Sequence, residues 1–168
     1  VRLLNTMDPQ APGTIISTEL TPHKIEAVAA KDNITAIKIK SGRMLLAHGF
    51  LSKVFECFAN HKTAIDMVTT SEVGVSVTID NPKHLDEIVN ELKTFGTVTV
   101  EKDMVIICVV GDMNSENVGF QAQIVNALKE IPIRMISYGG SNYNVSFLIQ
   151  ADNKKRALNA LSQHLFQA

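Results

Sequence analysis

The chain contains an internal repeat, and this repeat constrains the fold more than any single motif does. Gly49-Phe50 opens a segment that ends with an apolar run at 75–79, and Gly119-Phe120 opens a matching segment that ends with a run at 145–149. The two copies are offset by about seventy residues, a period that marks two similar supersecondary units packed on one another. The architecture should therefore consist of two related modules.

Hydrophobic periodicity predicts the same order of elements in both copies. The first copy should have a strand at 34–40, a helix from Gly49 to about residue 60, strands at 63–70 and 73–79, a helix started by Asn81-Pro82 and a strand at 97–101. The second should have a strand at 104–110, a helix at 120–128, strands at 131–138 and 143–149, and a last helix capped by Asp152. Ahead of both, the runs 25–30 and 34–40 flank residues 31–33 and predict a hairpin.

This order predicts an α+β fold of two ferredoxin-like βαββαβ modules, each an antiparallel sheet with its helices on one face. The second copy ends on its helix without a fourth strand, and an open sheet edge has to be covered. We therefore expect the modules, at 34–102 and 103–168, to be interlocked, with a strand from 24–33 completing the second one. Residues 1–23, with Pro9 and Pro12 in a turn-rich link, should be the tail of a preceding domain.

Composition narrows the function classes. A hydrophobic share of 45% with a net charge of −1 describes a globular chain, and a near-neutral balance disfavours binding to duplex nucleic acid, which needs a basic face. No apolar run approaches the ~20 residues of a membrane span. Cys57 and Cys108 lie within apolar patterns, so we expect two buried thiols in a reducing, cytoplasmic compartment.

Motifs of catalysis and metal binding are missing from the sequence. The chain has no phosphate-binding glycine loop of usual spacing, no His-Glu-x-x-His, no Cys-x-x-Cys, and five histidines that do not cluster. Gly139-Gly140 falls between two expected strands, which indicates a turn. We therefore expect no catalytic residue, no metal site and no cofactor, and a chain that binds a ligand.

The two copies differ at polar positions that could bind such a ligand. After Gly49, the free N–H groups of Phe50 and Leu51 could hold a carboxylate at a helix start. Asp66 interrupts an apolar run, and Ser71-Glu72 follows in a turn; in the second copy Asp66 becomes Arg134 and Glu72 becomes Asn142. An anion-binding helix end beside two carboxylates suits a zwitterion with an additional positive charge.

A structural explanation of the same residues stays open. Asp66 could lie on the solvent face of an edge strand and Glu72 in a solvated turn. Gly49 could serve only to start a helix, and Met44 could be an ordinary core residue.

Two longer segments resemble a known family. Residues 44–55 (MLLAHGFLSKVF) and 65–73 (IDMVTTSEV) resemble the regulatory region of aspartate kinase, the Thr-Thr-Ser-Glu phrase with its upstream Asp being the most specific part. Residues 134–139 and 164–166 resemble the second module of the lysine-sensitive, monofunctional type. The resemblance covers essentially the whole chain, although Ala47 and His48 differ from the more polar and basic residues expected there.

The resemblance implies two ACT modules that sense an end-product amino acid, L-lysine, and inhibit the phosphorylation of aspartate. Lysine would bind at the first module, across a contact between two subunits of a homo-oligomer. The implied pocket residues are Met44, Ala47, Gly49, Phe50, Leu51, Ile65, Asp66, Ser71 and Glu72. ATP and Mg²⁺ would bind only to the kinase domain upstream, so the chain alone should be inactive.

Two alternatives compete with an amino-acid sensor. One is a structural dimerisation module without a ligand, which would require Asp66 and Glu72 to point away from the start of the first helix. The other is a tandem RNA-binding pair, which would need exposed aromatic residues on the central strands. Only Tyr138, Tyr143 and Phe147 fall on expected strands.

Overall fold

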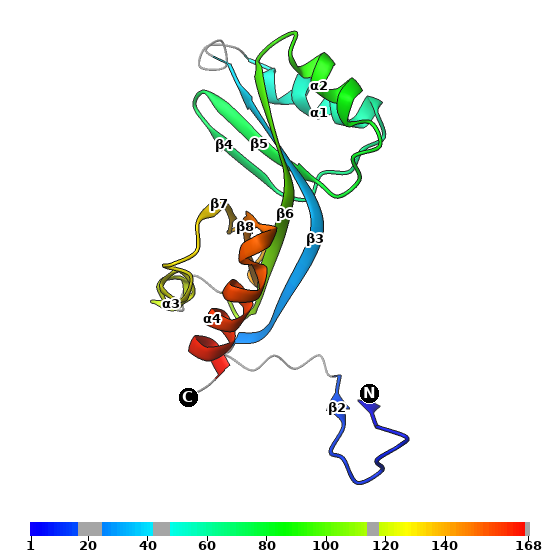
Figure 1. The fold of residues 1–168 in the computed structure, drawn as a ribbon, viewed down its shortest axis with the longest axis vertical. Coiled ribbons are helices and arrows are strands. Elements are labelled where there is room, and N and C mark those ends of the chain that lie inside the picture. Colours follow the sequence, from blue (N-terminus) through cyan, green and yellow to red (C-terminus); the bar gives the residue numbers. More distant parts are fainter. Residues whose placement is uncertain (17–24, 42–47, 114–117, 167–168) are drawn as a thin grey trace.

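A computed structural model describes residues 1–16, 25–41, 48–113 and 118–166 (Figure 1). The main sheet has six strands in the order β4-β5-β3-β6-β8-β7, and β1 and β2 form a separate two-stranded sheet. The strands are β1 (Arg2–Leu3), β2 (Thr14–Ile15), β3 (Ile25–Lys40), β4 (Val68–Ser71), β5 (Gly74–Ile79), β6 (Thr97–Gly111), β7 (Ile133–Ser137) and β8 (Asn144–Gln150). The α-helices are α1 (Phe50–Asn60), α2 (Leu85–Leu92), α3 (Phe120–Ala127) and α4 (Lys154–Phe166).

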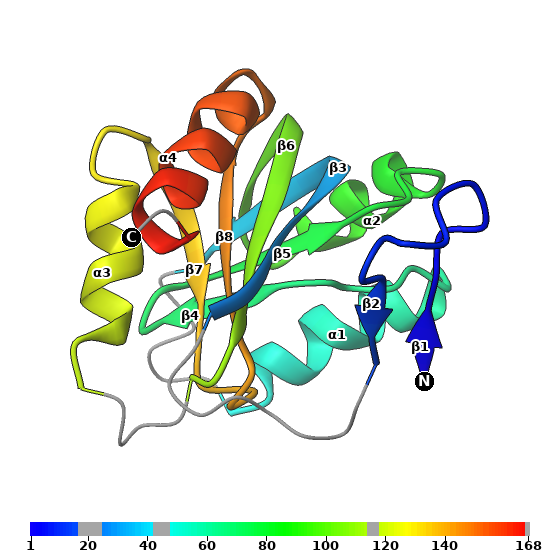
Figure 2. The same cartoon turned by 90° about the horizontal axis from the view of Figure 1, so that it is seen from below.

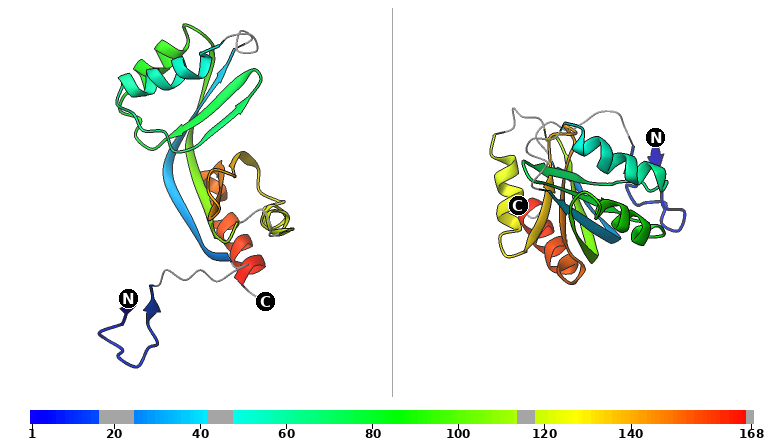
Figure 3. Two further views of the ribbon diagram at one scale, coloured as in Figure 1. Left: turned by 180° about the vertical axis from the view of Figure 1, so that it is seen from behind. Right: turned by 90° about the horizontal axis from the view of Figure 1, so that it is seen from above.

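The central strands β3 and β6 each run through both modules, so the predicted hairpin at 25–40 is wrong. Both halves of β3 pair antiparallel with β6, the register shifting between Lys31 and Ala36. At this point Asn33 has φ 60° and, on β6, Asp103 has φ 57°. Asn and Asp tolerate this left-handed conformation, and a local irregularity bends a strand without reversing it. The Lys-Asp-Asn signal therefore marks a bend. The curvature of β3 as a whole is visible in the left view of Figure 3.

Each half of the sheet has the ferredoxin-like strand order. The first module contains β4-β5-β3-β6 with α1 and α2, and the second contains β3-β6-β8-β7 with α3 and α4. The fold class, two interlocked modules, is thereby confirmed. Residues 27–31 of β3 pair with residues 106–110 of β6 beside β8, so β3 supplies the fourth strand of the second module. The expected limit between 102 and 103 falls inside β6, and the module boundaries stay a prediction.

Three apolar clusters hold this arrangement together. One lies under α1 and α2 and contains Val54 and Phe58; a second lies under α3 and α4 and contains Phe147. The third contains Met67 and Met135, the same position in the two repeats, with Ile34, Ala36, Met104, Ile106 and Leu148. Residues of both modules form this third cluster, and the edge strands β4 and β7 contact each other. In Figure 2 the strands of the two halves cross, which shows the strong twist of the sheet.

Several local predictions need adjustment. Strand β4 begins at Val68, because residues 63–67 have no regular strand pairing. Asp152 lies in a 3₁₀ turn (Ala151–Asn153) that precedes α4, so it does not cap that helix directly. Cys57 is buried as expected, whereas Cys108 is only partly buried. Among the described residues, no helix has both the length and the apolar character required to cross a membrane.

Candidate functional site

The start of α1 presents backbone donors without a side-chain cap. Gly49 precedes the helix with φ 81° and ψ 8°, and no side chain in the described part of the chain caps it. A Cβ built on Gly49 would meet no described atom within 4 Å. Glycine is thus required by the positive φ and not by close packing. The first-turn N–H groups of Phe50 and Leu51 have no partner within the helix, which makes this end suitable for an anion.

The turn between β4 and β5 lies beside the end of β3. Ser71 pairs with Gly74, and its Oγ donates to the Gly74 carbonyl at 3.4 Å. The Ser41 N–H donates to the Val73 carbonyl at 2.9 Å, which ties the end of β3 to this turn. Glu72 is exposed at the turn. Ser71 and Glu72 therefore lie at the end of the sheet from which the chain proceeds toward α1.

Asp66 has a partner that the sequence did not indicate. Its carboxylate accepts a hydrogen bond from the Lys31 ammonium at 2.6 Å, and the same ammonium lies 2.8 Å from the Asp80 carboxylate. Hydrogen bonds to these two carboxylates raise the pKa of Lys31, and the Lys31 ammonium lowers the pKa of Asp80. Since Lys31 belongs to the half of β3 that completes the second module, the Lys31–Asp66 pair joins the two modules. The Lys31–Asp66 pair lines a hollow of about 260 Å³, together with Met67 and Cys108.

A second ion pair occupies the equivalent place with the charges exchanged. Arg134, which matches Asp66 in the repeat, binds Glu101, with Nε 2.7 Å from Oε2. Glu101 precedes the bend at Asp103 as Lys31 precedes the bend at Asn33. The hydrogen bond to Glu101 raises the pKa of Arg134. The change from Asp66 to Arg134 between the repeats thus preserves an attraction between modules, and a ligand is not required to explain it.

The expected pocket residues fall into separate groups in one chain. Gly49, Phe50 and Leu51 lie at the start of α1, and Phe50 is buried while Leu51 is half-buried. Asp66 lies at the opposite end of β4 from Ser71 and Glu72, because its N–H bonds the Thr78 carbonyl whereas Ser71 pairs with Gly74. Six residues of extended chain span up to about 20 Å. Ile65 packs on the first-module core. Met44 and Ala47 lie outside the described residues.

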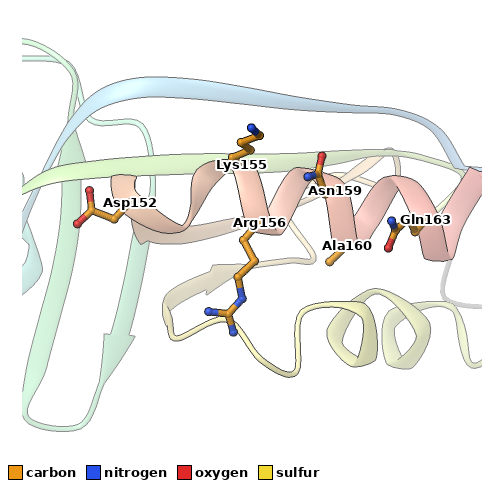
Figure 4. Close-up of a pocket in the computed structure, with 6 residues that line it drawn as sticks. All are labelled: Asp152, Lys155, Arg156, Asn159, Ala160 and Gln163. Atoms are coloured by element: carbon orange, nitrogen blue, oxygen red, sulfur yellow. The ribbon is translucent and has the colours of Figure 1, made fainter.

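Two other surfaces do not form a comparable site. Among the described strands, the one aromatic residue is Phe147, and it is 1% exposed, so these strands have no exposed platform on which bases could stack. A shallow hollow of about 470 Å³ lies along α4 (Figure 4). Its lining residues come from this helix and the turn before it, and Arg156 bonds the Glu130 carbonyl, so polar groups do not converge there from different elements.

Comparison with known proteins places this architecture in a family. The ACT domain model matches residues 107–165. A solved structure described as a putative C-terminal regulatory domain of aspartate kinase from Porphyromonas gingivalis W83 is 60% identical, with a TM-score of 0.77 over 84% of this chain and 97% of that one. The chain belongs to the aspartate kinase family. It is a regulatory region of the ACT type, an architecture consistent with allosteric control.

More distant relatives extend over the whole chain. The chain is 33% identical to chloroplastic aspartokinase 1 of Arabidopsis thaliana, covering 100% of this chain and 32% of that protein. It is 30% identical to lysine-sensitive aspartokinase 3 of Escherichia coli K12, covering 97% and 38%. The E. coli aspartokinase III structure in complex with lysine and aspartate, described as the T-state, is 31% identical with a TM-score of 0.81 over 96% of this chain and 38% of that one. This aspartate kinase region thus spans about a third of the curated relatives it matches.

Proposed function

We propose that this regulatory region binds L-lysine at its first module and thereby inhibits the ATP-dependent phosphorylation of L-aspartate by a kinase domain of the same protein. The observation that carries the proposal is the alignment of 97% of the chain with a lysine-sensitive aspartokinase, whose solved relative contains lysine. The uncapped start of α1 supports a site for such a ligand. Its carboxylate would bind the uncapped amides of Phe50 and Leu51.

The amino groups of the ligand require acceptors, and the candidates are Ser71, Glu72 and Asp66. Glu72 and Asp66 lie at opposite ends of β4. The partners on β5, Thr78 for Asp66 and Gly74 for Ser71, are four residues apart, or about 13 Å along the strand, so we infer that one lysine molecule does not bridge both carboxylates within one chain. We therefore propose that the pocket forms between two copies of the first module in a homo-oligomer, so that acceptors from one copy face the α1 start of the other.

Lys31 gives this site an internal competitor. Its ammonium already contacts Asp66 at 2.6 Å and Asp80 at 2.8 Å, which is the interaction that a ligand ammonium would make. A ligand that takes the Asp66 oxygen now bound by Lys31 would displace Lys31 and release a contact between the modules. Binding would thereby change how the first module is attached to the second.

Thermodynamic linkage then connects binding to inhibition. A ligand shifts a conformational equilibrium only by its difference in affinity for the two states, typically ~1–3 kcal/mol of coupling. Release of the Lys31 contact would be one such difference. The continuous strands β3 and β6 would carry the altered arrangement to both modules.

The test is isothermal titration of L-lysine into the chain, with L-threonine as the control ligand. Asp66→Ala should abolish or strongly weaken lysine binding. Glu101→Gln is the matched control, because it removes the equivalent ion pair on the second-module side and should leave lysine binding intact. Equal loss in both variants would mean that the ion pairs act only through the fold, and full binding by Asp66→Ala would refute the role of Asp66.

One observation favours a second candidate, a dimerisation module without a ligand. The ion pair with Lys31 alone is enough to explain the presence of Asp66 at this position, and a ligand is not required. A stable dimer that shows no binding heat and no thermal shift with lysine or threonine would support this candidate over the amino-acid sensor.

A further inference from the structure

Three side chains with metal-binding chemistry converge between α1 and α2 of the first module, at the opposite end of α1 from the proposed amino-acid site. Cys57 and His61 belong to α1 and its C-terminal cap, and Glu91 belongs to α2. Their ligand atoms, Sγ, a ring nitrogen and a carboxylate oxygen, all lie within 4.8 Å of one another. The closest pair is His61 Nε2 and Glu91 Oε2 at 3.0 Å.

The fold itself produces this convergence. Cys57 and His61 are four residues apart, so they project from the same side of α1. Helix α2 packs against α1 and presents Glu91 to that side. Because the third ligand comes from a different helix, sequence spacing alone does not reveal the cluster.

We propose that Cys57, His61 and Glu91 bind one divalent transition-metal ion of the zinc class. Sulfur, imidazole nitrogen and carboxylate oxygen are the donors that Zn²⁺ takes, whereas Mg²⁺ and Ca²⁺ require oxygen ligands. Bond lengths of ~2.0–2.3 Å around a tetrahedral ion place ligand atoms about 3.3–3.8 Å apart. His61 Nε2 and Glu91 Oε2, now 3.0 Å apart, would have to separate slightly, whereas any separation near the 4.8 Å limit would have to shorten by about 1 Å.

The surroundings define both the closed and the open side of the site. Cys57 is 0% exposed, whereas the side chains of His61 and Glu91 are 25% and 42% exposed. The ion would thus be enclosed on the sulfur side and reachable by water on the other. Water or His84, whose ring centroid lies 6.3 Å from that of His61, could take the fourth position.

Metal binding would replace a proton on sulfur. Burial, and secondarily the Glu91 carboxylate, raise the pKa of Cys57 to about 12, and the thiol lies 3.7 Å from the Ile88 carbonyl that it can donate to. On binding, the S–H bond breaks, its proton passes to water, and the sulfur lone pair forms the bond to the ion. No electron transfer is involved. The bound ion would link α1 to α2 and stabilise the first module.

Cobalt(II) is the probe for this site, because thiolate-bound tetrahedral Co²⁺ absorbs in the visible and near-ultraviolet and Zn²⁺ displaces it. The wild-type chain should bind one equivalent of Co²⁺ with these bands. Glu91→Gln, at a half-exposed position that should not disturb folding, and Cys57→Ser should each weaken Co²⁺ binding at least about tenfold. Cys108→Ser is the matched control, because Cys108 lies on β6 and should leave the titration unchanged.

A second readout separates the site from adventitious binding at surface histidines. Zn²⁺ should raise the unfolding midpoint of the wild type and of Cys108→Ser, and should do so markedly less for Glu91→Gln. The proposal is overturned if the wild type shows no saturable thiolate band. It is equally overturned if Cys57→Ser and Glu91→Gln bind Co²⁺ as tightly as the wild type.

Discussion

The two repeat glycines allow the backbone at the proposed ligand site to be tested against an internal control. Gly49 precedes α1 with φ 81°, and Gly119 precedes α3 with φ 87°. At both positions a Cβ would meet no described atom within 4 Å. Substitution by alanine therefore adds a backbone penalty with no steric clash against the described residues. The same change can be made in both modules at nearly the same conformation.

The magnitude follows from these angles. A non-glycine residue in the left-handed region costs about 1–2 kcal/mol, and the reduced freedom of the unfolded chain returns about 0.4–1 kcal/mol when glycine becomes alanine. We expect Gly49→Ala and Gly119→Ala each to destabilise the chain by roughly 1 kcal/mol, or about 2–4 °C in Tm for a chain of this size. Gly49→Asn should cost less, because asparagine tolerates a positive φ.

Chemical denaturation and lysine titration of the three variants form the assay. Equal destabilisation by the two alanine variants, with loss of lysine binding only in Gly49→Ala, would agree with an anion site at the start of α1. A cost above about 3 kcal/mol for one alanine variant, with none for the other, would refute the backbone explanation, because the two positions have matching φ and equal space. Unchanged lysine binding by Gly49→Ala would mean that the ligand carboxylate does not need the left-handed conformation of glycine at residue 49.

Three further perturbations address stability. Phe58→Ala and Phe147→Ala each remove a side chain that is 1% exposed in a different module core, and each should destabilise the chain by about 3–5 kcal/mol. Because β3 and β6 cross both modules, both substitutions should lower the temperature of one shared calorimetric transition. Two separate transitions would contradict the interlock. Lys31→Met should cost less than about 1 kcal/mol in urea denaturation, since the Lys31 side chain is 48% exposed and solvent screens its ion pairs. Folding raises the pKa of the Cys57 thiol from 9.0 to about 12. The thiol therefore loses its proton at lower pH in the unfolded chain, and stability should fall between about pH 9 and 12. Cys57→Ala should flatten this alkaline decline, whereas Cys108→Ala should not.

Local patterns predicted the elements and their order well, and long-range partners poorly. The apolar stripe of Val54 and Phe58 predicted α1, because helical periodicity depends only on nearby residues. The sequence of residues 31–33 predicts a hairpin turn, because Asp and Asn favour both turns and left-handed bends. Only the pairing of both halves of β3 with one partner, β6, distinguishes the two outcomes.

The sequence predicts only part of the candidate site, again because some partners are distant in sequence. The free amides after Gly49 follow from local helix geometry, so the sequence could indicate them. The role of Asp66 depends on Lys31, 35 residues away in sequence and on the strand shared with the other module. The sequence shows that Asp66 and Arg134 differ between the repeats. The reason for the difference is visible only in the structure, where Asp66 pairs with Lys31 and Arg134 pairs with Glu101.

The charge exchange between the repeats has a structural explanation in the interlock. In two identical halves, the residues that face each other across the shared strands would repeat the same charge pattern. Here the Lys31–Asp66 pair on one side corresponds to the Glu101–Arg134 pair on the other, and each pair joins opposite charges. If the two modules exchanged places on the shared strands, Lys31 would face Arg134 and Asp66 would face Glu101. Like charges at such distances repel. The exchange would therefore favour one assignment of modules to strands, while leaving the first module with the carboxylate that the proposed ligand could use.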